Sequence, residues 1–472
     1  MAEPMHFSRR ALLRATTLTA AGALLPAVRT PTASAATPAD DPWSQVPALL
    51  ERITPPVFPD RVFPVTDFGA APGQDATQAV AAAIAACAAA GGGTVLVPPG
   101  RYPTGAIHLL GNTNLHLQDG ATLAFSPDPA AYLPVVFTRW EGTECYNYSP
   151  LIYAFGQENV AVTGPGVLDG QGGDGPWESW YRTSTLQGPD QRLLRQMGST
   201  GVPLEQRVFG AGHYLRPQLL QFNRCRNVLV SDVTIVDPPM WTVHPVLCSN
   251  VTIRDITVDS VLYNTDGVDV ESSRLVHITG SRFNTNDDCV AVKSGRDEDG
   301  LRVGVPSEDV VVRNCQFSGR WGGITVGSEM SGGARRIFAE NCEINPADFP
   351  GRYPVKYPVY IKASKKRGSY IDGVYARRFT GSGVERDVAF VNMDYNGGEG
   401  GTLPVSVRDI RIDQFEIDGA RAVLNLVGLA TDRMDGVHVS RSVFTGVRGP
   451  DTVSYADDVT YEKVSVNGTE VA

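Results

Sequence analysis

The sequence lacks the features that mark nucleic-acid-binding and zinc-binding proteins. Its 41 lysine and arginine residues are outnumbered by 51 aspartate and glutamate residues, which gives a net charge of −10. Because phosphate backbones are bound by a surplus of basic side chains, we expect no nucleic-acid partner. The chain also has no Cys-x-x-Cys pair and no cysteine–histidine cluster. We therefore expect neither a metal nor a cofactor.

Outside the N-terminal region, no apolar run approaches the roughly 20 residues that a membrane-spanning helix needs. Ser8-Arg9-Arg10 precedes an Ala/Leu-rich run that ends near Val28, and Ala33-Ser34-Ala35 follows as a small-residue cleavage site. The twin arginine resembles a Tat export signal, and an ordinary secretory signal with two chance arginines is the alternative. We expect residues 1–36 to be a signal peptide, and the mature protein to be secreted, monomeric and free of the membrane.

Cysteine is sparse, and its seven positions lie far apart. An odd number leaves at least one cysteine outside any internal disulfide. Several fall inside the sequence repeat described below, so we interpret most of them as small buried core residues. The seven are Cys87, Cys145, Cys225, Cys248, Cys289, Cys315 and Cys342.

Glycine is abundant, with 49 residues, and only 19% of the chain is charged. This composition favours an all-β protein over a helical one. Residues 37–60 are rich in proline and aspartate and predict a linker, which would leave 61–472 as one domain. In that domain, Asp75 is placed to cap a helix that runs to about Ala90, and Val95–Val97 predicts a buried strand. A short helix before the first strand is suited to cap one end of a stack of strands.

A repeat of short β-rich segments occupies most of the chain. Each copy is an apolar, often Asn-preceded stretch followed by a second β-rich pair, at spacings of about 23 to 27 residues with longer gaps at inserted loops. This period predicts a right-handed parallel β-helix, in which each coil contributes short strands that stack on the last coil. Propeller repeats are longer, and leucine-rich repeats follow another consensus. Clear copies begin at Asn159, Asn227, Asn250, Leu275, Asp309 and Arg336.

Several polar and aromatic residues share one phase on successive coils. Counted from the first Val or Ile of each repeat, they fall 11 to 16 residues along the coil where no loop intervenes. Since parallel strands lie about 4.8 Å apart, such a set would line one face of the helix as a cleft. The set comprises Trp241, His244, Asn264, Asp266, Asp287, Asp288 and Trp321, and then Tyr360 and Lys362 after an inserted loop.

The aspartates of this set predict acid–base chemistry. Asp266 and the pair Asp287/Asp288 would lie on neighbouring coils, and carboxylates that close raise the pKa of at least one partner. One acid can then hold a proton while others activate water, which is the division of labour in glycoside hydrolysis. The alternative is that these aspartates cap turns or bind a structural cation.

The motifs resemble those of glycoside hydrolase family 28, the pectin-degrading polygalacturonases, and most of all its bacterial exo-acting branch. The segments that carry the resemblance are N-T-D-G-V-D at Asn264, D-D-C-V-A-V-K-S-G-R at Asp287 and G-G-I-T-V-G-S-E-M-S-G-G at Gly322. The resemblance implies a secreted, inverting enzyme acting on pectic polysaccharide or oligosaccharide. Asp287 would be the general acid, Asp266 and Asp288 would activate water, and Asn264 would position substrate or that water. Inversion implies carboxyl groups about 6.5–9.5 Å apart.

Three positions depart from the family pattern. Trp321 stands where the family usually has histidine, and Asn286 replaces a glycine before the aspartate pair. In Tyr360-Ile361-Lys362 only the lysine of the family's basic pair remains. Because tyrosine cannot replace a bidentate arginine, recognition of the substrate carboxylate would differ here. Trp321 would offer an apolar face to a sugar, so a modified galacturonide or another pectic sugar is an alternative substrate.

Trp241 and His244 would form a neighbouring subsite, and the alternative for both is simple packing in the core. Arg296 would contact a substrate carboxylate or pair with an adjacent acid. Two other functions stay open. One is a pectate-lyase-type eliminase on the same fold, and the other is a non-catalytic carbohydrate-binding β-helix.

Overall fold

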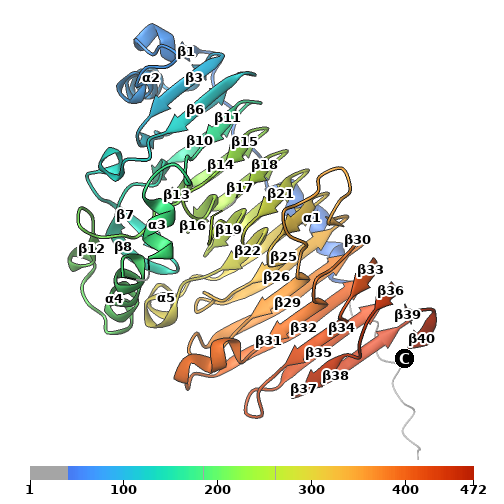
Figure 1. The fold of residues 1–472 in the computed structure, drawn as a ribbon. Coiled ribbons are helices and arrows are strands. Elements are labelled where there is room, and N and C mark those ends of the chain that lie inside the picture. The colour runs from blue at the N-terminus through green and yellow to red at the C-terminus, as the bar shows by residue number, and fades with distance from the viewer. Residues whose placement is uncertain (1–40, 184, 261, 472) are drawn as a thin grey trace, which may run out of the picture. The chain divides into compact units, whose positions relative to one another are not determined.

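The computed structural model describes residues 41–471 except 184 and 261. The proposed signal peptide, residues 1–36, lies outside this range. The described chain forms the expected right-handed parallel β-helix, in which successive coils stack along one axis (Figure 1). Three long sheets, named A, B and C here, run along the stack, and most coils add one strand to each of them.

Sheet A carries the repeat signature. Val228, Val251, Val276, Val310 and Ile337 pair in register across five neighbouring strands, so the first β-branched residues of the repeats form one buried column. In order, the strands are β1 (Val62–Pro64), β2 (Gly93–Val97), β5 (Thr113–Leu117), β10 (Glu158–Thr163), β14 (Arg226–Ser231), β17 (Ser249–Arg254), β20 (Arg274–Thr279), β23 (Ser307–Arg313), β26 (Ala334–Glu340), β29 (Ser369–Arg377), β32 (Val405–Asp413), β35 (Met434–Ser440) and β38 (Ala456–Glu462).

The asparagine of the early repeats occupies a left-handed backbone position, with φ between 55° and 59° at Asn112, Asn159, Asn227 and Asn250. Asparagine tolerates this conformation better than most residues do. The side chains form a ladder, since each of the last three donates from Nδ2 to Oδ1 of the preceding asparagine at 2.7–2.8 Å. The ladder explains why asparagine precedes the apolar segment in the sequence.

Sheet B contributes stacked aromatic rings to the core. Phe283 pairs with Phe317 at a ring separation of 5.9 Å, and Phe379 and Phe415, which directly precede β30 and β33, stack at 4.7 Å. Its strands are β3 (Gly100–Thr104), β6 (Ala121–Phe125), β11 (Val167–Asp169), β15 (Thr234–Val236), β18 (Thr257–Asp259), β21 (Arg282–Thr285), β24 (Gln316–Gly319), β27 (Glu343–Ile344), β30 (Thr380–Ser382), β33 (Glu416–Ala420), β36 (Val443–Val447), β39 (Val464–Val466) and β40 (Thr469–Val471).

Sheet C presents the outward face on which the candidate site lies. Its side chains alternate between the core and the outside. In β28, Val359 and Ile361 belong to the apolar core, whereas Tyr360 and Lys362 point away from it. The strands are β4 (Ile107–His108), β9 (Ile152–Phe155), β13 (Leu220–Asn223), β16 (Val243–Val246), β19 (Val268–Glu271), β22 (Val290–Lys293), β25 (Gly322–Val326), β28 (Tyr357–Lys362), β31 (Asp387–Asn392), β34 (Ala422–Val427) and β37 (Thr452–Ser454).

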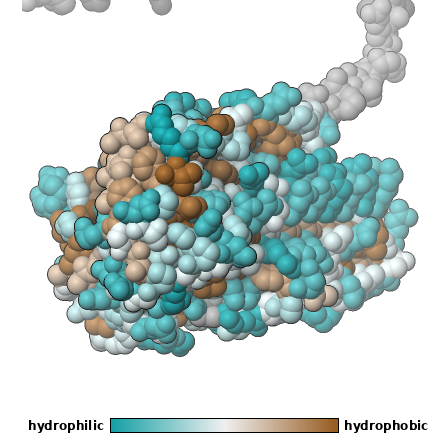
Figure 2. Space-filling model, turned by 90° about the horizontal axis from the view of Figure 1, so that it is seen from above, coloured by the Kyte–Doolittle hydropathy of each residue, from teal (hydrophilic) through white to brown (hydrophobic). Residues whose placement is uncertain are grey.

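The expected capping helix is α2 (Thr77–Ala89), which packs at the end of the stack near β1 and β2 (Figure 1). Asp75 Oδ1 accepts a hydrogen bond of 3.0 Å from the backbone N–H of Thr77, and Val80 and Ile84 are buried against the core. Seen from this end, the surface is largely hydrophilic, with apolar residues in smaller areas (Figure 2). Helix α2 therefore covers apolar core that an open end of the solenoid would expose to water.

The prediction of a linker over residues 37–60 is wrong for its central part. Pro42–Gln45 forms a 3-10 helix, and α1 (Val46–Arg52) follows. Trp43, Val46 and Leu49 pack on the outer face of sheet A against Val311 and Phe338. The proline and aspartate content suggested a linker, but the apolar residues between them form a second, smaller core with the sheet.

Inserted elements flank sheet C. They are β7 (Val136–Trp140), β8 (Thr143–Asn147), β12 (Val208–Phe209), α3 (Trp177–Arg182), α4 (Gln187–Ser199) and α5 (Asp297–Val303). Short 3-10 helices cover Val65–Phe68, Pro129–Tyr132, Leu204–Gln206 and Tyr395–Gly400.

All seven cysteines are buried and unpaired, as expected for most of them. Across the described residues, we find no helix with the length and apolar character needed to span a bilayer.

Candidate active site

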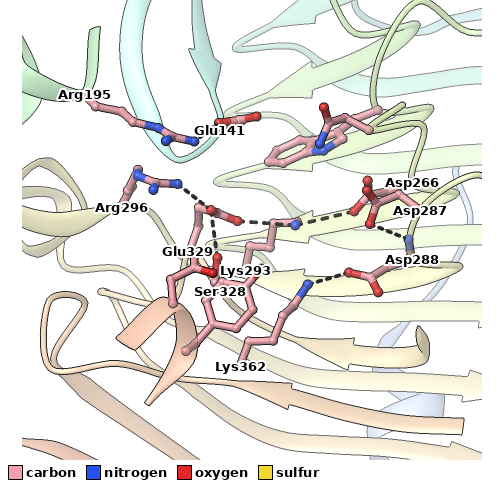
Figure 3. A pocket seen from close by; sticks show the side chains of 14 residues that line it. Glu141, Arg195, Asp266, Asp287, Asp288, Lys293, Arg296, Ser328, Glu329 and Lys362 are labelled. Carbon is pink, nitrogen blue, oxygen red and sulfur yellow. Dashed lines mark hydrogen bonds and ion pairs between the residues drawn. The ribbon is translucent and has the colours of Figure 1, made fainter. Parts of the chain in front are cut away.

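A polar cavity of about 170 Å³ lies on the outer face of sheet C (Figure 3). Its residues come from five consecutive coils, those of β16 to β28, and from three inserted segments. Fourteen side chains line it: Glu141, Arg195, Trp241, Asn264, Asp266, Asp287, Asp288, Lys293, Arg296, Ser328, Glu329, Lys362, Tyr395 and Asn396. Seven of the ten predicted site residues are among them.

The three predicted catalytic aspartates meet in this cavity. Asp266 precedes β19, and Asp287 and Asp288 precede β22 on the next coil. One carboxylate oxygen from each lies within 4.8 Å of the others. Asp266 and Asp288 are buried, while Asp287 is half-buried. The coil-by-coil stacking predicted from the repeat thus brings the acids together.

The electrostatics of the cluster raise the pKa of Asp287 and of Asp266 to different extents. Burial, followed by the charge of Asp266 and Asp288, raises the pKa of Asp287 well above its usual range. Burial also raises the pKa of Asp266 to about 6, against the opposing charge of Lys293. Close carboxylates and low solvent access therefore favour a proton on Asp287, while Asp266 is ionised above pH 6.

Asp288 is held by two direct partners. Lys362 Nζ lies 2.7 Å from Asp288 Oδ2, and the backbone N–H of Gly322 donates to Asp288 Oδ1 at 2.8 Å. Burial alone would lower the pKa of Lys362, but Asp288, with smaller contributions from Tyr395 and Tyr360, outweighs it and raises that pKa above its usual value. Lys362 and Asp288 therefore form a charged, buried pair. The lysine was predicted to bind substrate, and its ammonium group is directed at an active-site acid.

Lys293 is the second ammonium group in the cavity, and no role was predicted for it. Its Nζ lies 3.5 Å from an oxygen of Asp266, 3.5 Å from one of Asp269 and 3.4 Å from one of Glu329. It also lies 4.5 Å from the centre of the Trp241 ring. Lys293 thus balances several acids, and Trp241 covers it with an aromatic face, which is the geometry of a cation–π contact.

Asn264 lines the cavity and is positioned from behind by Arg216. This arginine is fully buried, donates to Asn264 Oδ1 at 3.2 Å and also donates to the backbone oxygen of Tyr263 at 2.8 Å. Asn264 itself has a left-handed backbone, with φ of 58°. A buried guanidinium that bonds both the side chain and its neighbouring backbone fixes the direction of the amide.

The far wall of the cavity consists of two arginine–glutamate pairs. Arg296 donates to Glu329 at 2.7 Å, and Arg195 on α4 donates to Glu141 at 2.6 Å (Figure 3). Burial would raise the pKa of Glu329, but the charges of Lys293, Arg296, Arg367 and Lys362 together outweigh it and hold that pKa below its usual range. This wall presents fixed charges and hydrogen-bond donors to whatever enters the cavity.

Three predicted substrate-binding residues do not line the cavity. His244 is fully buried and lies 2.8 Å from Glu271, and burial lowers its pKa. Tyr360 is buried and stacks on Phe390 at 5.5 Å, while the half-buried Trp321 is covered by Lys356, whose Nζ lies 3.6 Å from the ring centre. The shared phase placed these residues correctly on the outer face, but neighbouring side chains cover them.

Sequence reasoning missed the residues that come from insertions. Glu141, Arg195, Tyr395 and Asn396 belong to segments without a repeat pattern, so no periodicity could place them. Ser328 and Glu329 lie inside G-S-E-M-S-G-G, a segment that was recognised as a motif but given no role. The charge of Glu329 within this glycine-rich motif was the signal in the sequence that could have indicated a site residue.

The three aspartates also offer oxygens at a spacing that could hold a cation. The same carboxylates contact the ammonium groups of Lys293 and Lys362, at 3.5 Å for Asp266 and 2.7 Å for Asp288. A divalent ion would have to share these ligands with two fixed positive charges. The arrangement suits internal charge balance better than a metal site.

The family description "Glycosyl hydrolases family 28" matches residues 210–430 of this chain. The hyperthermoactive exopolygalacturonase from Thermotoga maritima has a solved structure that superposes with a TM-score of 0.85 at 38% identity, over 90% of this chain and 96% of that one. The chain belongs to glycoside hydrolase family 28. The family and the likeness to its exo-acting branch were both predicted from the motifs, and both are confirmed.

Curated relatives of family 28 agree with this placement. A probable polygalacturonase from Vitis vinifera is 30% identical over 60% of this chain, and this chain spans 52% of that relative's length. An exopolygalacturonase from Platanus acerifolia is 24% identical over 66% of this chain and 79% of its own length. Both relatives are polygalacturonases by name, and the three aspartates of this chain lie inside the segment that matches the family model.

Proposed function

We propose that this protein is a secreted glycosidase that hydrolyses glycosidic bonds of pectic polysaccharide or oligosaccharide, by a polygalacturonase-like reaction. The observation that carries the proposal is the meeting of Asp266, Asp287 and Asp288 in one polar cavity. The names of the family 28 relatives point to the galacturonide class of substrate. Export through the N-terminal twin-arginine segment is part of the same proposal.

Asp287 acts as general acid in this proposal. Its raised pKa keeps a proton on the carboxyl group at neutral pH, and its half-buried side chain is accessible from the cavity. The proton passes to the glycosidic oxygen as the bond to the leaving sugar breaks. A group with an ordinary carboxyl pKa would have lost that proton before substrate arrived.

Asp266 and Asp288 orient and deprotonate the attacking water. Asp266 is ionised above its pKa of about 6, and Asp288 lies 2.7 Å from the ammonium group of Lys362. Asn264, which Arg216 fixes, provides an amide for the substrate or the water. The water loses its proton to a carboxylate while its oxygen bonds to the anomeric carbon, so the charge on the cluster is conserved over the step.

The stereochemical outcome in this proposal is inversion, as the family resemblance implies. The nearest oxygens of the three acids lie within 4.8 Å, which is closer than the separation of about 6.5–9.5 Å between carboxyl groups that typically leaves room for a water. Inversion therefore rests on the resemblance and not on the spacing. Proton NMR of the first-formed product tests it directly, because a retained anomer would contradict it.

We infer exo action from the wall of the cavity. Glu141 and Arg195 come from the β7–β8 hairpin and α4, and Tyr395 and Asn396 come from the loop after β31. These insertions cover part of sheet C that the repeats alone would leave open. A chain end fits against such a wall, whereas a continuous polymer would have to pass through it.

Products formed from a pectic oligosaccharide panel test the proposal. We expect new reducing ends, release of short products from the first minutes, and loss of turnover in Asp287→Asn with substrate binding retained. Growth of absorbance near the ultraviolet edge would instead identify an eliminase. Binding without any turnover by the wild-type protein would identify a non-catalytic β-helix.

A further inference from the structure

A row of cations lies beside Asp287, outside the cavity. Arg320, Lys356 and Arg386 come just before β25, β28 and β31, so they occupy one turn on three consecutive coils. The coils are tied there by backbone bonds, because the N–H of Lys356 donates to Trp321 O at 2.9 Å and the N–H of Arg386 donates to Lys356 O at 3.2 Å. We call Arg320, Lys356 and Arg386 the basic ladder.

The basic ladder is not neutralised by the protein. Within the described ranges, Arg320 and Lys356 form no ion pair, and Arg386 reaches Glu385 only at 3.9 Å with its side chain 56% exposed. Burial, with the charges of Arg320 and Arg386, lowers the pKa of Lys356, and the charges of Glu385 and Asp287 oppose it without reversing the shift. Elsewhere on sheet C such cations are matched, as Arg421 is by Asp387 at 2.7 Å. An unmatched positive row is expected to attract an anionic ligand.

Aromatic rings frame the same surface. The guanidinium of Arg320 lies 5.0 Å from the ring centre of Tyr263 and 5.2 Å from that of Tyr353, and Lys356 covers Trp321. Tyr263 directly precedes Asn264, and Trp321 directly precedes Gly322, whose N–H holds Asp288. Flat rings beside cations suit an acidic sugar, since the ring stacks on the sugar face while the cation binds its carboxylate.

We propose that the basic ladder binds the carboxylates of the leaving-group side of a polyuronide chain. The inference rests on the proposed function, in which Asp287 protonates the leaving oxygen, so the departing chain lies beside Asp287. Parallel strands place successive ladder positions about 4.8 Å apart, a step comparable to one sugar unit. Arg320 and Lys356 would then replace the arginine that the family resemblance predicts at the position of Tyr360, which is buried against Phe390.

The test uses full-length protein, with binding measured by calorimetry in the Asp287→Asn background and turnover measured in wild type. Arg320→Gln and Lys356→Met should each weaken binding of an unesterified galacturonate oligomer about five- to tenfold, the value of one partly exposed charge-assisted bond. The same oligomer with methyl-esterified carboxyl groups should bind all variants alike. Arg408→Gln is the matched control, since Arg408 pairs with Asp372 on sheet A at 2.7 Å.

The outcomes are distinguishable. If wild type cleaves the acidic oligomer and the ladder variants bind it as well as the control does, the ladder assignment is wrong while the proposed function stands. If wild type neither cleaves nor binds any pectic oligomer, the proposed function fails and the ladder assignment fails with it. If the ladder variants lose affinity for the acidic oligomer and not for the esterified one, both the ladder assignment and the proposed function are supported.

Discussion

The ammonium group of Lys362 lies 2.7 Å from the carboxylate of Asp288, and both side chains are buried. The family resemblance implies that this lysine binds the substrate. In the structure its nearest partner is the carboxylate of Asp288, so its charge first serves as the counter-charge of that buried acid. The pair links the stability of the fold to the proposed chemistry, because the same two side chains balance a buried charge and place an acid in the cavity.

Removing the lysine should therefore destabilise the protein as well as inactivate it. Lys362→Met leaves Asp288 buried without its counter-charge, and breaking a buried pair in this way costs about 3–5 kcal/mol. We expect a lower urea midpoint for unfolding and loss of turnover. The double variant Lys362→Met/Asp288→Asn should recover much of the stability and none of the activity, whereas equal stability of the single variant and wild type would contradict the pairing.

The rate should fall on the acid side of neutrality. Asp266 must be charged to accept a proton, and burial raises its pKa to about 6. Lowering the pH through 6 protonates it, so kcat/KM should drop by about tenfold for each further pH unit. A pH profile of kcat/KM on an oligosaccharide of fixed charge checks this. If kcat/KM stays constant down to the pH at which ordinary carboxyl groups titrate, Asp266 is not the base.

A fourth aspartate supports the base from below. Asp269 is fully buried, Lys293 Nζ lies 3.5 Å from its Oδ1, and neither of its carboxylate oxygens has a hydrogen-bond partner among the described residues. Burial and the charge of Asp266 raise the pKa of Asp269 well above its usual range, so we expect Asp269 to hold a proton that it can donate to Asp266.

Two substitutions at Asp269 separate its donor role from its bulk. Asp269→Asn keeps a donor toward Asp266 and should leave the acid limb of the pH profile in place. Asp269→Leu removes the donor and should move that limb to higher pH, because the charged form of Asp266 loses a hydrogen bond. Identical profiles for the two variants would rule out the donor role. Infrared spectroscopy near pH 7 should also show the carboxylic-acid band of Asp269 disappear in Asp269→Asn, while the band of the protonated Asp287 remains.

Activity should not depend on a divalent cation. Asp266 and Asp288 are already matched by Lys293 and Lys362. Prolonged treatment with a chelator should leave the initial rate unchanged, and added calcium should not raise it. A rate that fell on chelation and returned with one metal would favour an eliminase or a metal-assisted reaction.

Much of the fold was readable from the chain because its cause is local and repeated. Val228, Val251 and Val276 recur at a coil's length, and stacking identical coils buries them in one column. The same period put Asp266 on the coil next to Asp287 and Asp288. The segment around Trp43 was misread as a linker because its partner, Phe338, lies almost 300 residues away and shares no pattern with it.

Sequence alone determined the solenoid, the family and the three acids, since each depends on periodicity or on a short motif whose members stay close once the coils stack. Only the tertiary structure decided which groups neutralise those acids and what encloses them. Lys293, Glu329 and Arg195 reach the cavity from a strand end, a loop and an inserted helix. Their contacts depend on side-chain packing between segments that lie far apart in the chain. Residue spacing within one segment does not encode such packing.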